Sequence, residues 1–215
     1  MGCRFVSISC FVDMKNGNGL LIVLYGPSGV GKSKQLDLLE ERFSKLKTSA
    51  KRVEYPVYHL KPTGQILKKI LWGQGGQKEE EEMQKLFVEN RKDFEPTLRS
   101  WLAAGMIVLA EDYKGTGIVW GVTRRLPIAK MEEMNMDFIE PDISILIDGP
   151  RRLDLRPGEG HIYQQDEDEW YRARKVYLQM ADKYGWVRVG GDAPILTVAD
   201  RIWAVIRPVL AERGR

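Results

Sequence analysis

The chain has 215 residues, of which 43% are hydrophobic and 29% are charged, which is typical of a globular protein and suits one α/β domain with a lid. A formal net charge of +3 gives no support for nucleic-acid binding, and no run of about 18 apolar residues indicates a membrane span. The two cysteines, Cys3 and Cys10, precede the first predicted strand, so we expect no disulfide framework and a cytoplasmic location.

Residues 1–19 are interpreted as an N-terminal extension, either disordered or absent from the native protein, and residues 20–213 as one domain. The extension contains a short apolar run, Phe5–Val12, which lacks the small-residue cleavage site of a signal peptide. Met14 offers a second start just before the first strand, and translation from Met14 would omit both cysteines.

The first predicted elements surround a glycine-rich loop. The run Leu20–Tyr25 is apolar and β-prone, which predicts a buried strand. It is followed by Gly26-Pro-Ser-Gly-Val-Gly-Lys-Ser33, which matches the pattern Gly-x-x-x-x-Gly-Lys-[Ser/Thr] at every fixed position. The apolar spacing of Lys34–Phe43 then predicts a helix. Strand, loop and helix in this order are the context in which this motif binds phosphate.

The loop therefore predicts binding of a nucleoside triphosphate. Its glycines let backbone N–H groups turn toward phosphate oxygens, and the helix N-terminus adds partial positive charge. Lys32 can reach the β- and γ-phosphates, and the Ser33 hydroxyl can ligate Mg²⁺. The predicted nucleotide-binding residues are Gly26, Pro27, Ser28, Gly29, Val30, Gly31, Lys32, Ser33 and Lys34.

After this helix, predicted strands and helices alternate along the chain. Strands are predicted in Val53–Tyr58, with an end at Pro56, and over Met106–Ala110, Asp142–Ile147 and Trp186–Val189. Helices are predicted from an N-cap at Thr63 to Leu71, from residue 78 to Arg91, and over Phe94–Ala104, Glu169–Tyr184 and Val198–Arg213. Residues 149–168 are polar and predict a mobile lid. This alternation predicts a three-layer α/β fold, with a five-stranded parallel sheet flanked by helices.

Acidic side chains end two of the predicted strands, at the edge of the sheet where ligands of such folds bind. Mg²⁺ prefers oxygen ligands, so Glu111, Asp112 and Asp148 are candidates to face Ser33. We favour Glu111 or Asp112, because the polar segment up to Gly117 comes directly after them, whereas Asp148 could instead cap the lid. Each acid could also simply cap a helix.

The predicted lid supplies arginines that could neutralise a phosphoryl group during transfer. Arginine pairs with phosphate through two parallel hydrogen bonds. Arg151, Arg152 and Arg156 are the candidates, although any one of them could equally be a solvated surface residue.

An aromatic and a basic residue, Phe87 and Arg91, stand four positions apart and so share one helix face. Phe87 could stack on a base while Arg91 bonds a base carbonyl or a phosphate. The alternative is a core phenylalanine beside a surface arginine.

Several segments beyond the loop resemble thymidylate kinases, which are P-loop nucleoside monophosphate kinases, and the resemblance runs from about Leu20 to Leu210. The segments that carry it are Tyr55–Gly64, Leu86–Arg91, Glu111–Gly121, Pro141–Asp148, Tyr184–Val187 and Ile202–Pro208. The resemblance implies a P-loop NTPase fold, usually in a homodimer, and transfer of the γ-phosphate of ATP to dTMP with Mg²⁺, which gives dTDP for dTTP biosynthesis.

The resemblance also implies roles for individual residues. Phe87 would stack on thymine, Arg91 would bond the base, Tyr55 would line the acceptor pocket, and Trp120 would disfavour a 2′-hydroxyl. The substrate-binding residues would be Tyr55, Lys61, Phe87, Arg91, Asp112, Tyr113, Gly117 and Trp120. The catalytic residues would be Lys32, Glu111, Arg151, Arg152 and Arg156, and the metal ligands Ser33 and Glu111.

One motif departs from the family pattern. The family usually has Asp-Arg-Tyr or Asp-Arg-His after the third strand, with the arginine on the acceptor phosphate, where this chain has Glu111-Asp112-Tyr113. An aspartate opposite a phosphate repels it unless a cation lies between. Lys61, Arg91, Lys114 or a second metal could compensate. Ser28 also stands where the family often has an acid.

These observations leave two alternative functions open. Another nucleoside monophosphate or a deoxynucleoside could be the acceptor, in which case the pair of Phe87 and Arg91 and the position of Trp120 would be the discriminating features. The absence of the usual arginine instead suggests the hypothesis of a nucleotide-binding protein that no longer transfers phosphate. A nucleic-acid-binding ATPase is disfavoured, because the sequence has no dense basic patch with aromatics.

Overall fold

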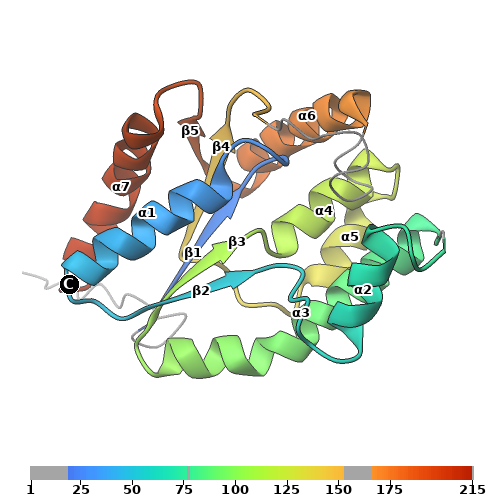
Figure 1. Cartoon of the computed structure of the whole chain (residues 1–215), viewed down its shortest axis with the longest axis horizontal. Coiled ribbons are helices and arrows are strands. Elements are labelled where there is room, and N and C mark those ends of the chain that lie inside the picture. Colours follow the sequence, from blue (N-terminus) through green and yellow to red (C-terminus); the bar gives the residue numbers. More distant parts are fainter. Residues whose placement is uncertain (1–18, 77, 153–165, 215) are drawn as a thin grey trace, which may run out of the picture.

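The computed structural model describes residues 19–76, 78–152 and 166–214. Five strands form one parallel sheet in the order β2-β3-β1-β4-β5. Their bounds are β1 Leu20–Tyr25, β2 Ala50–Glu54, β3 Ile107–Glu111, β4 Ile143–Asp148 and β5 Val187–Gly190. The fold expected from the sequence, a parallel five-stranded sheet between two helical layers, is confirmed (Figure 1).

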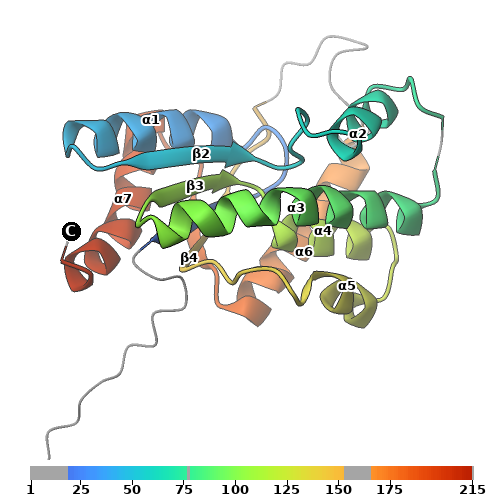
Figure 2. The same ribbon diagram turned by 90° about the horizontal axis from the view of Figure 1, so that it is seen from below.

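The helices cover both faces of the sheet. Their bounds are α1 Lys32–Lys45, α2 Thr63–Leu71, α3 Glu80–Ala103, α4 Lys114–Thr123, α5 Ile128–Asn135, α6 Glu167–Tyr184 and α7 Ile195–Glu212. The helices α1 and α7 pack on one face, and α3, α4 and α6 cover the other, as Figures 1 and 2 show. Within the described ranges, no helix combines the length and apolar character that crossing a membrane requires.

The central strand β1 supplies side chains to both cores. Leu20, Ile22 and Leu24 belong to the core under α1 and α7, whereas the alternate residues belong to the core under α3, α4 and α6. All six residues of β1 are buried, because a parallel sheet with both faces covered has no solvated face. The loop after β1 therefore starts from a rigid point at the centre of the molecule.

The second strand lies earlier in the chain than predicted. The structure forms β2 over Ala50–Glu54. The Tyr55 N–H still donates to the Glu111 carbonyl oxygen on β3 at 3.0 Å, and the chain bends at Tyr55 and Pro56. This strand is at the edge of the sheet, so polar side chains such as Lys51 are tolerated there and apolar character is a poor guide. The displaced segment that carries Tyr55 instead lines a pocket beyond the sheet.

The two helices predicted on either side of residues 92 and 93 are one helix, α3, with Pro96 inside it. Val88, Phe94, Leu98 and Leu102 are all buried and continue one apolar stripe across the predicted break. A proline inside a helix costs about 3 kcal/mol. Burial of each large apolar side chain contributes roughly 1.5–3 kcal/mol, so the stripe as a whole outweighs that cost.

The start of α2 also differs from the prediction in one detail. Pro62, and not Thr63, is the N-cap, and Thr63 is the first helical residue. The Thr63 hydroxyl donates instead to Asp93 Oδ2 at 2.7 Å and accepts from Asn90 Nδ2 at 3.2 Å. It therefore ties α2 to α3 and does not cap its own helix.

The helices α4 and α5 were not predicted. In α4, glycines lower the helical signal. Two of these glycines allow close packing. A Cβ on Gly115 would lie 2.6 Å from the Trp186 ring, and one on Gly121 would lie 2.4 Å from Met131 Sδ. The segment thus meets the packing requirements of its neighbours, and its N-terminal turn places Thr116 beside Asp112, which directly follows β3.

Candidate active site

The glycine-rich loop connects β1 to α1, and its backbone takes conformations that favour glycine. Gly26, Gly29 and Gly31 have φ angles of 145°, 83° and 96°. Within the loop, Lys32 is buried, and its Nζ donates to the carbonyl oxygen of Gly26 at 2.8 Å and to that of Pro27 at 3.4 Å. The loop therefore surrounds the lysine and holds its ammonium group against the carbonyl oxygens at the start of the loop.

A pocket of about 410 Å³ lies over the loop at the carboxyl ends of β1 and β3. The predicted site residues that line it are Ser28, Gly29, Gly31, Lys32, Ser33, Lys34, Tyr55, Glu111, Asp112 and Arg152. Within the same loop, Val30 is buried in the core below, and Pro27 contributes only its carbonyl to Lys32. The pocket combines glycine backbone, cations and carboxylates, which is the composition of a phosphate and metal site.

The oxygen donors needed for a divalent cation meet in this pocket. Ser33 Oγ donates to Glu111 Oε1 at 2.8 Å, so the hydroxyl and the carboxylate are within reach of one ion. Arg52 on β2 pairs with the other oxygen, Glu111 Oε2, at 3.3 Å and with Asp37 Oδ1 at 2.6 Å. Mg²⁺ usually takes one or two protein oxygens together with phosphates and waters, so this donor set fits Mg²⁺.

Asp112 lies beside Lys32 of the glycine-rich loop and lines the pocket over that loop. Its φ of 60° is in the left-handed region, which aspartate tolerates better than most residues. Thr116 Oγ1 donates to Asp112 Oδ1 at 2.8 Å, and Lys32 Nζ lies 3.6 Å from Asp112 Oδ2. Burial raises the pKa of Asp112 to about 6, Glu111 adds to the rise, and Lys32 opposes it.

Replacement of Asp112 by asparagine should make stability depend less on pH. Asp112 has a folded pKa of about 6 against an ordinary value of 3.8, so between these pH values the folded protein holds a proton that the unfolded chain has released. Stability is therefore lost as the pH rises through this window, by up to about 3 kcal/mol. Asparagine avoids this loss, so the Asp112→Asn variant should gain on the wild type from pH 4 to pH 6.

Urea unfolding of both proteins, without nucleotide or metal, at pH 4, 5, 6 and 7 measures this difference. Carboxylates far from Asp112 contribute equally to the two proteins and cancel in the comparison, whereas Glu111 and Glu54 interact with Asp112 and belong to the measured difference. A difference in unfolding free energy that stays constant over this range would contradict the assigned pKa.

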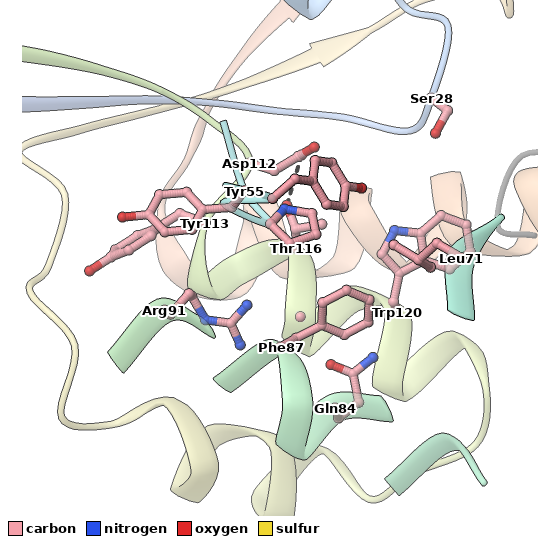
Figure 3. A pocket seen from close by; sticks show the side chains of 13 residues that line it. Ser28, Tyr55, Leu71, Gln84, Phe87, Arg91, Asp112, Tyr113, Thr116 and Trp120 are labelled. Carbon is pink, nitrogen blue, oxygen red and sulfur yellow. Dashed lines mark hydrogen bonds between the residues drawn. The ribbon is translucent and has the colours of Figure 1, made fainter. Parts of the chain in front are cut away.

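A second pocket adjoins the first and opens between α2, α3 and α4 (Figure 3). Seven of its lining residues are among the predicted substrate-binding residues: Tyr55, Phe87, Arg91, Asp112, Tyr113, Gly117 and Trp120. In the view of Figure 3, the Phe87 ring lies between the Arg91 guanidinium and the Trp120 indole. The two pockets share Ser28, Tyr55, Pro56, Tyr58 and Asp112, so groups bound in them would meet at Asp112.

Arg91 is buried beneath this second pocket, so it is not the surface arginine of the alternative interpretation. Its Nη2 donates to Asn135 Oδ1 at 2.9 Å, and its guanidinium carbon lies 5.4 Å from the Phe138 ring centroid. Burial lowers the pKa of Arg91 to about 10, which still leaves it charged at neutral pH. Its Nε is buried with no hydrogen-bond partner among the described residues, so a ligand carbonyl could take this donor.

Two tyrosines form the wall beside Arg91. Tyr113 donates from its hydroxyl to Glu95 Oε2 at 3.1 Å, which fixes the ring. Tyr55 packs against Tyr113 with 5.1 Å between ring centroids, and the described residues offer its buried hydroxyl no hydrogen-bond partner. Gly117 allows Arg91 to approach α4 closely, because a Cβ at Gly117 would lie 2.9 Å from Arg91 Nη2 and would require the guanidinium to shift. The pocket is thus a rigid aromatic slot with a few polar groups inside it.

Comparison of the sequence and the fold with known proteins shows the family of this chain. The family model described as thymidylate kinase matches residues 24–202, which is most of the chain. The chain belongs to the thymidylate kinase family.

Individual relatives of this thymidylate kinase family member are distant in sequence. A protein of Invertebrate iridescent virus 6, provisionally named thymidylate kinase 251L, is 26% identical over 92% of each chain. A protein of Thermococcus gammatolerans, provisionally named a thymidylate kinase, is 25% identical over 80% of this chain and 87% of its own length. The solved thymidylate kinase of Candida albicans superposes with a TM-score of 0.74, at 18% identity, over 92% of this chain and 94% of that one, which shows a shared fold.

The predicted lid arginines of this family member lie at or beyond the end of β4. Arg152 donates from Nη2 to the carbonyl oxygens of Gly191 and Ala193, at 2.8 and 3.1 Å, and its backbone N–H donates to Gly29. Arg151, the preceding residue, is half-buried. Residues 153–165, and with them Arg156 and most of the predicted lid, lie outside the described residues, as do residues 1–18 of the N-terminal extension.

The residues suggested as substitutes for the missing arginine lie in different places. Lys61 is exposed and lies outside the two described pockets. Lys114 turns to Glu140 and to the carbonyl oxygen of Phe138. Asp148, the alternative metal ligand, is held by Arg174 through two hydrogen bonds, at 2.6 and 3.1 Å. Among the described cations, Lys32 is therefore the one that stands beside Asp112.

Several pocket residues were not predicted. Gln84 and Leu71 line the second pocket, Tyr58 and Pro56 line both, and Thr116 holds Asp112. Gln84 lies three residues before Phe87, so the helical spacing that singled out Phe87 and Arg91 could have found it. No comparable signal marks the others: Pro56 and Tyr58 lie in the turn after β2, Thr116 lies on the unpredicted helix α4, and Leu71 reads as an ordinary apolar residue at the end of α2.

Proposed function

We propose that this thymidylate kinase family member transfers the γ-phosphate of ATP to dTMP, with Mg²⁺, and releases dTDP and ADP. The observation that carries the proposal is the contact between the two pockets at Asp112. The first pocket contains the glycine loop with Lys32, and the second contains the aromatic slot with Phe87 and Arg91. A donor nucleotide and an acceptor nucleotide bound in them would meet with their phosphates near Lys32.

The residues of the first pocket support phosphoryl transfer. Lys32 would leave its contact with Gly26 and bond β- and γ-phosphate oxygens, where it stabilises the charge on the moving group. Ser33 and Glu111 would hold Mg²⁺, which when bound neutralises phosphate charge. Arg52 would keep the Glu111 carboxylate turned toward Ser33. Arg151, Arg152 and Arg156 remain the proposed arginines of the lid.

The second pocket supports a pyrimidine deoxynucleotide as acceptor. Phe87 offers a ring face to the base, and Arg91 offers buried N–H donors to a base carbonyl. Trp120 and Tyr55 narrow the slot, and a ribose 2′-hydroxyl would meet Trp120 in the orientation that the resemblance implies. Lys61 stays a proposed contact of the acceptor loop. A homodimer and a cytoplasmic location are further proposals, which the family resemblance and the cysteine positions support.

The experiment that tests the proposal measures ADP release from ATP and Mg²⁺ with a panel of acceptors. The panel contains dTMP, its 2′-hydroxylated form, dUMP, dCMP, dGMP, dAMP and thymidine, with no acceptor and with EDTA as controls. We expect dTMP to stimulate release at least about 10-fold over the purine nucleotides, because we propose that the slot lined by Tyr55, Phe87 and Trp120 holds a pyrimidine. EDTA should abolish it. Stimulation by another acceptor alone, or ATP binding without any stimulation, would refute the proposal.

A further inference from the structure

One buried amide in the acceptor pocket has an unused acceptor atom. Gln84 on α3 is fully buried and lines the pocket with Phe87 and Arg91. Its Nε2 donates to Glu80 Oε1 at 2.7 Å, whereas its Oε1 has no hydrogen-bond partner among the described residues. A buried carbonyl oxygen without a partner costs roughly 1–3 kcal/mol, so its position in a pocket points to a bound donor.

The orientation of this amide is fixed by a chain of charged groups. Glu80 can only accept a hydrogen bond when ionised, so the NH₂ group of Gln84 must face it. Glu80 Oε2 in turn accepts from Arg124 Nη1 at 3.0 Å. Arg124 binds Glu169 on α6 through two hydrogen bonds of 2.8 and 3.0 Å. The oxygen of Gln84 is therefore held toward the pocket by a chain of residues that ends on α6.

Gln84 shares its helix face with the two residues assigned to the base. Positions 84, 87 and 91 are spaced by three and four residues, which places them on one stripe of α3. Figure 3 shows Gln84 beside the Phe87 ring, with its amide oxygen turned to the side on which Arg91 lies. A base stacked on Phe87 would therefore find hydrogen-bond donors at Arg91 and one acceptor at Gln84.

We propose that Gln84 is a specificity-determining residue that accepts a hydrogen bond from N3–H of the thymine base. The inference rests on the proposed function, with dTMP as the acceptor. In a thymine nucleotide the base has one hydrogen-bond donor, N3–H, and its exocyclic carbonyl oxygens at C2 and C4 are acceptors that suit Arg91. Cytosine has an unprotonated N3, so its lone pair would face the Gln84 oxygen, and a buried contact between two acceptors is unfavourable.

The test combines a change in the protein with a change in the ligand. Titration calorimetry would measure the binding of dTMP and of N3-methyl-dTMP to the wild type and to Gln84→Met, which keeps the side-chain length and removes the amide. We expect Gln84→Met to weaken dTMP about 5-fold, the usual effect of one lost hydrogen bond. N3-methylation should weaken binding to the wild type by more than it weakens binding to the variant. The variant already lacks the hydrogen bond between Gln84 and N3–H, so methylation has no such bond to remove.

A matched control is available on the other face of the sheet. Gln35 on α1 is also buried, donates from Nε2 to the carbonyl of Ile195 at 3.0 Å, and has an unpartnered Oε1 within the described structure, but it lies outside both pockets. Gln35→Met should leave the ratio of dTMP to N3-methyl-dTMP affinity unchanged. If it changed that ratio as much as Gln84→Met does, the effect would be a general consequence of losing a buried amide, and the inference would be overturned.

Two further measurements keep the inference falsifiable. If Gln84→Met does not fold, Glu80→Gln retains Gln84 but allows its amide to turn over, and it should lower the preference for dTMP over dCMP. An equal loss of affinity on N3-methylation in wild type and variant would overturn the inference. So would a finding that Gln84→Met weakens dTMP but not 2′,3′-dideoxy-TMP, because Gln84 would then bind the 3′-hydroxyl. Wild-type turnover of dTMP, measured in parallel, separates this result from failure of the proposed function.

Discussion

Replacement of Lys32 by alanine is expected to lower kcat by about 100- to 1,000-fold, because in the proposed function the variant loses the cation that would stabilise charge on the transferred phosphoryl group. Lys32 is buried in the loop, with its Nζ 2.8 Å from the Gly26 carbonyl and 3.6 Å from Asp112. The ammonium group is thus already held at the junction of the two pockets. Its removal leaves the glycine loop, Ser33 and Glu111 in place, so Mg²⁺ and nucleotide should still bind.

The measurement is steady-state ADP release at saturating dTMP, together with the melting temperature of each protein. Lys45→Ala is the matched control, because Lys45 is on the same helix but is 72% exposed and pairs only with Glu41 among the described residues. Its turnover should equal that of the wild type. If Lys32→Ala kept more than about a third of wild-type turnover while remaining folded, the assigned role of Lys32 would be wrong, since one such donor normally supplies several kcal/mol to the transition state.

Periodicity and motif together were enough to predict the centre of the fold. Leu20–Tyr25 is apolar throughout because both faces of β1 are covered, and the loop motif predicts the helix α1 directly after it. The edge strand β2 could not be placed in the same way, since its outer residues face solvent. The helix α4 was missed because glycines lower its helix propensity. Gly115 and Gly121 are present because a Cβ at these positions would contact Trp186 and Met131.

The candidate site shows the same division. Phe87 and Arg91 were found because they are neighbours on one helix face, and Glu111 and Asp112 because they lie at the end of a buried strand. That these four residues line adjoining pockets depends on the fold, which joins segments far apart in the sequence. Helical spacing could have placed Gln84 beside Phe87, but only the structure shows that its amide is buried with Oε1 unpartnered among the described residues. The roles of all these residues in binding and catalysis remain predictions.

Asp112 stands where the resemblance leads us to expect an arginine, which would affect how an acceptor phosphate is held. Asp112 is accompanied by Lys32 and Thr116, and its raised pKa reflects burial near Glu111. A phosphate bound beside it would therefore need a cation that reaches the same point. Lys32 does so, and the Mg²⁺ that we propose at Ser33 and Glu111 would also do so. Affinity for dTMP in this chain should accordingly come mainly from the base end of the pocket, where Arg91 lies.

Arg91→Ala is expected to raise the KM for dTMP by roughly 10- to 100-fold and to change the KM for ATP by less than about 2-fold. A hydrogen bond from a charged donor contributes about 1.5–3 kcal/mol, and Arg91 lines the acceptor pocket but not the phosphate-loop pocket. The substitution also leaves Asn135 Oδ1 without its partner and opens space beside Phe138, so some loss of thermal stability should accompany it.

Arg91→Met separates the two effects, because it fills the space under Phe138 but cannot donate a hydrogen bond. It should recover part of the stability and none of the dTMP affinity. Lys92→Ala, at the exposed neighbouring position of α3, is the control and should match the wild type in both constants. An equal loss of ATP and dTMP affinity would assign Arg91 to the donor side or to the core alone. A loss confined to dTMP, and retained in Arg91→Met, would show that the buried guanidinium binds the acceptor base.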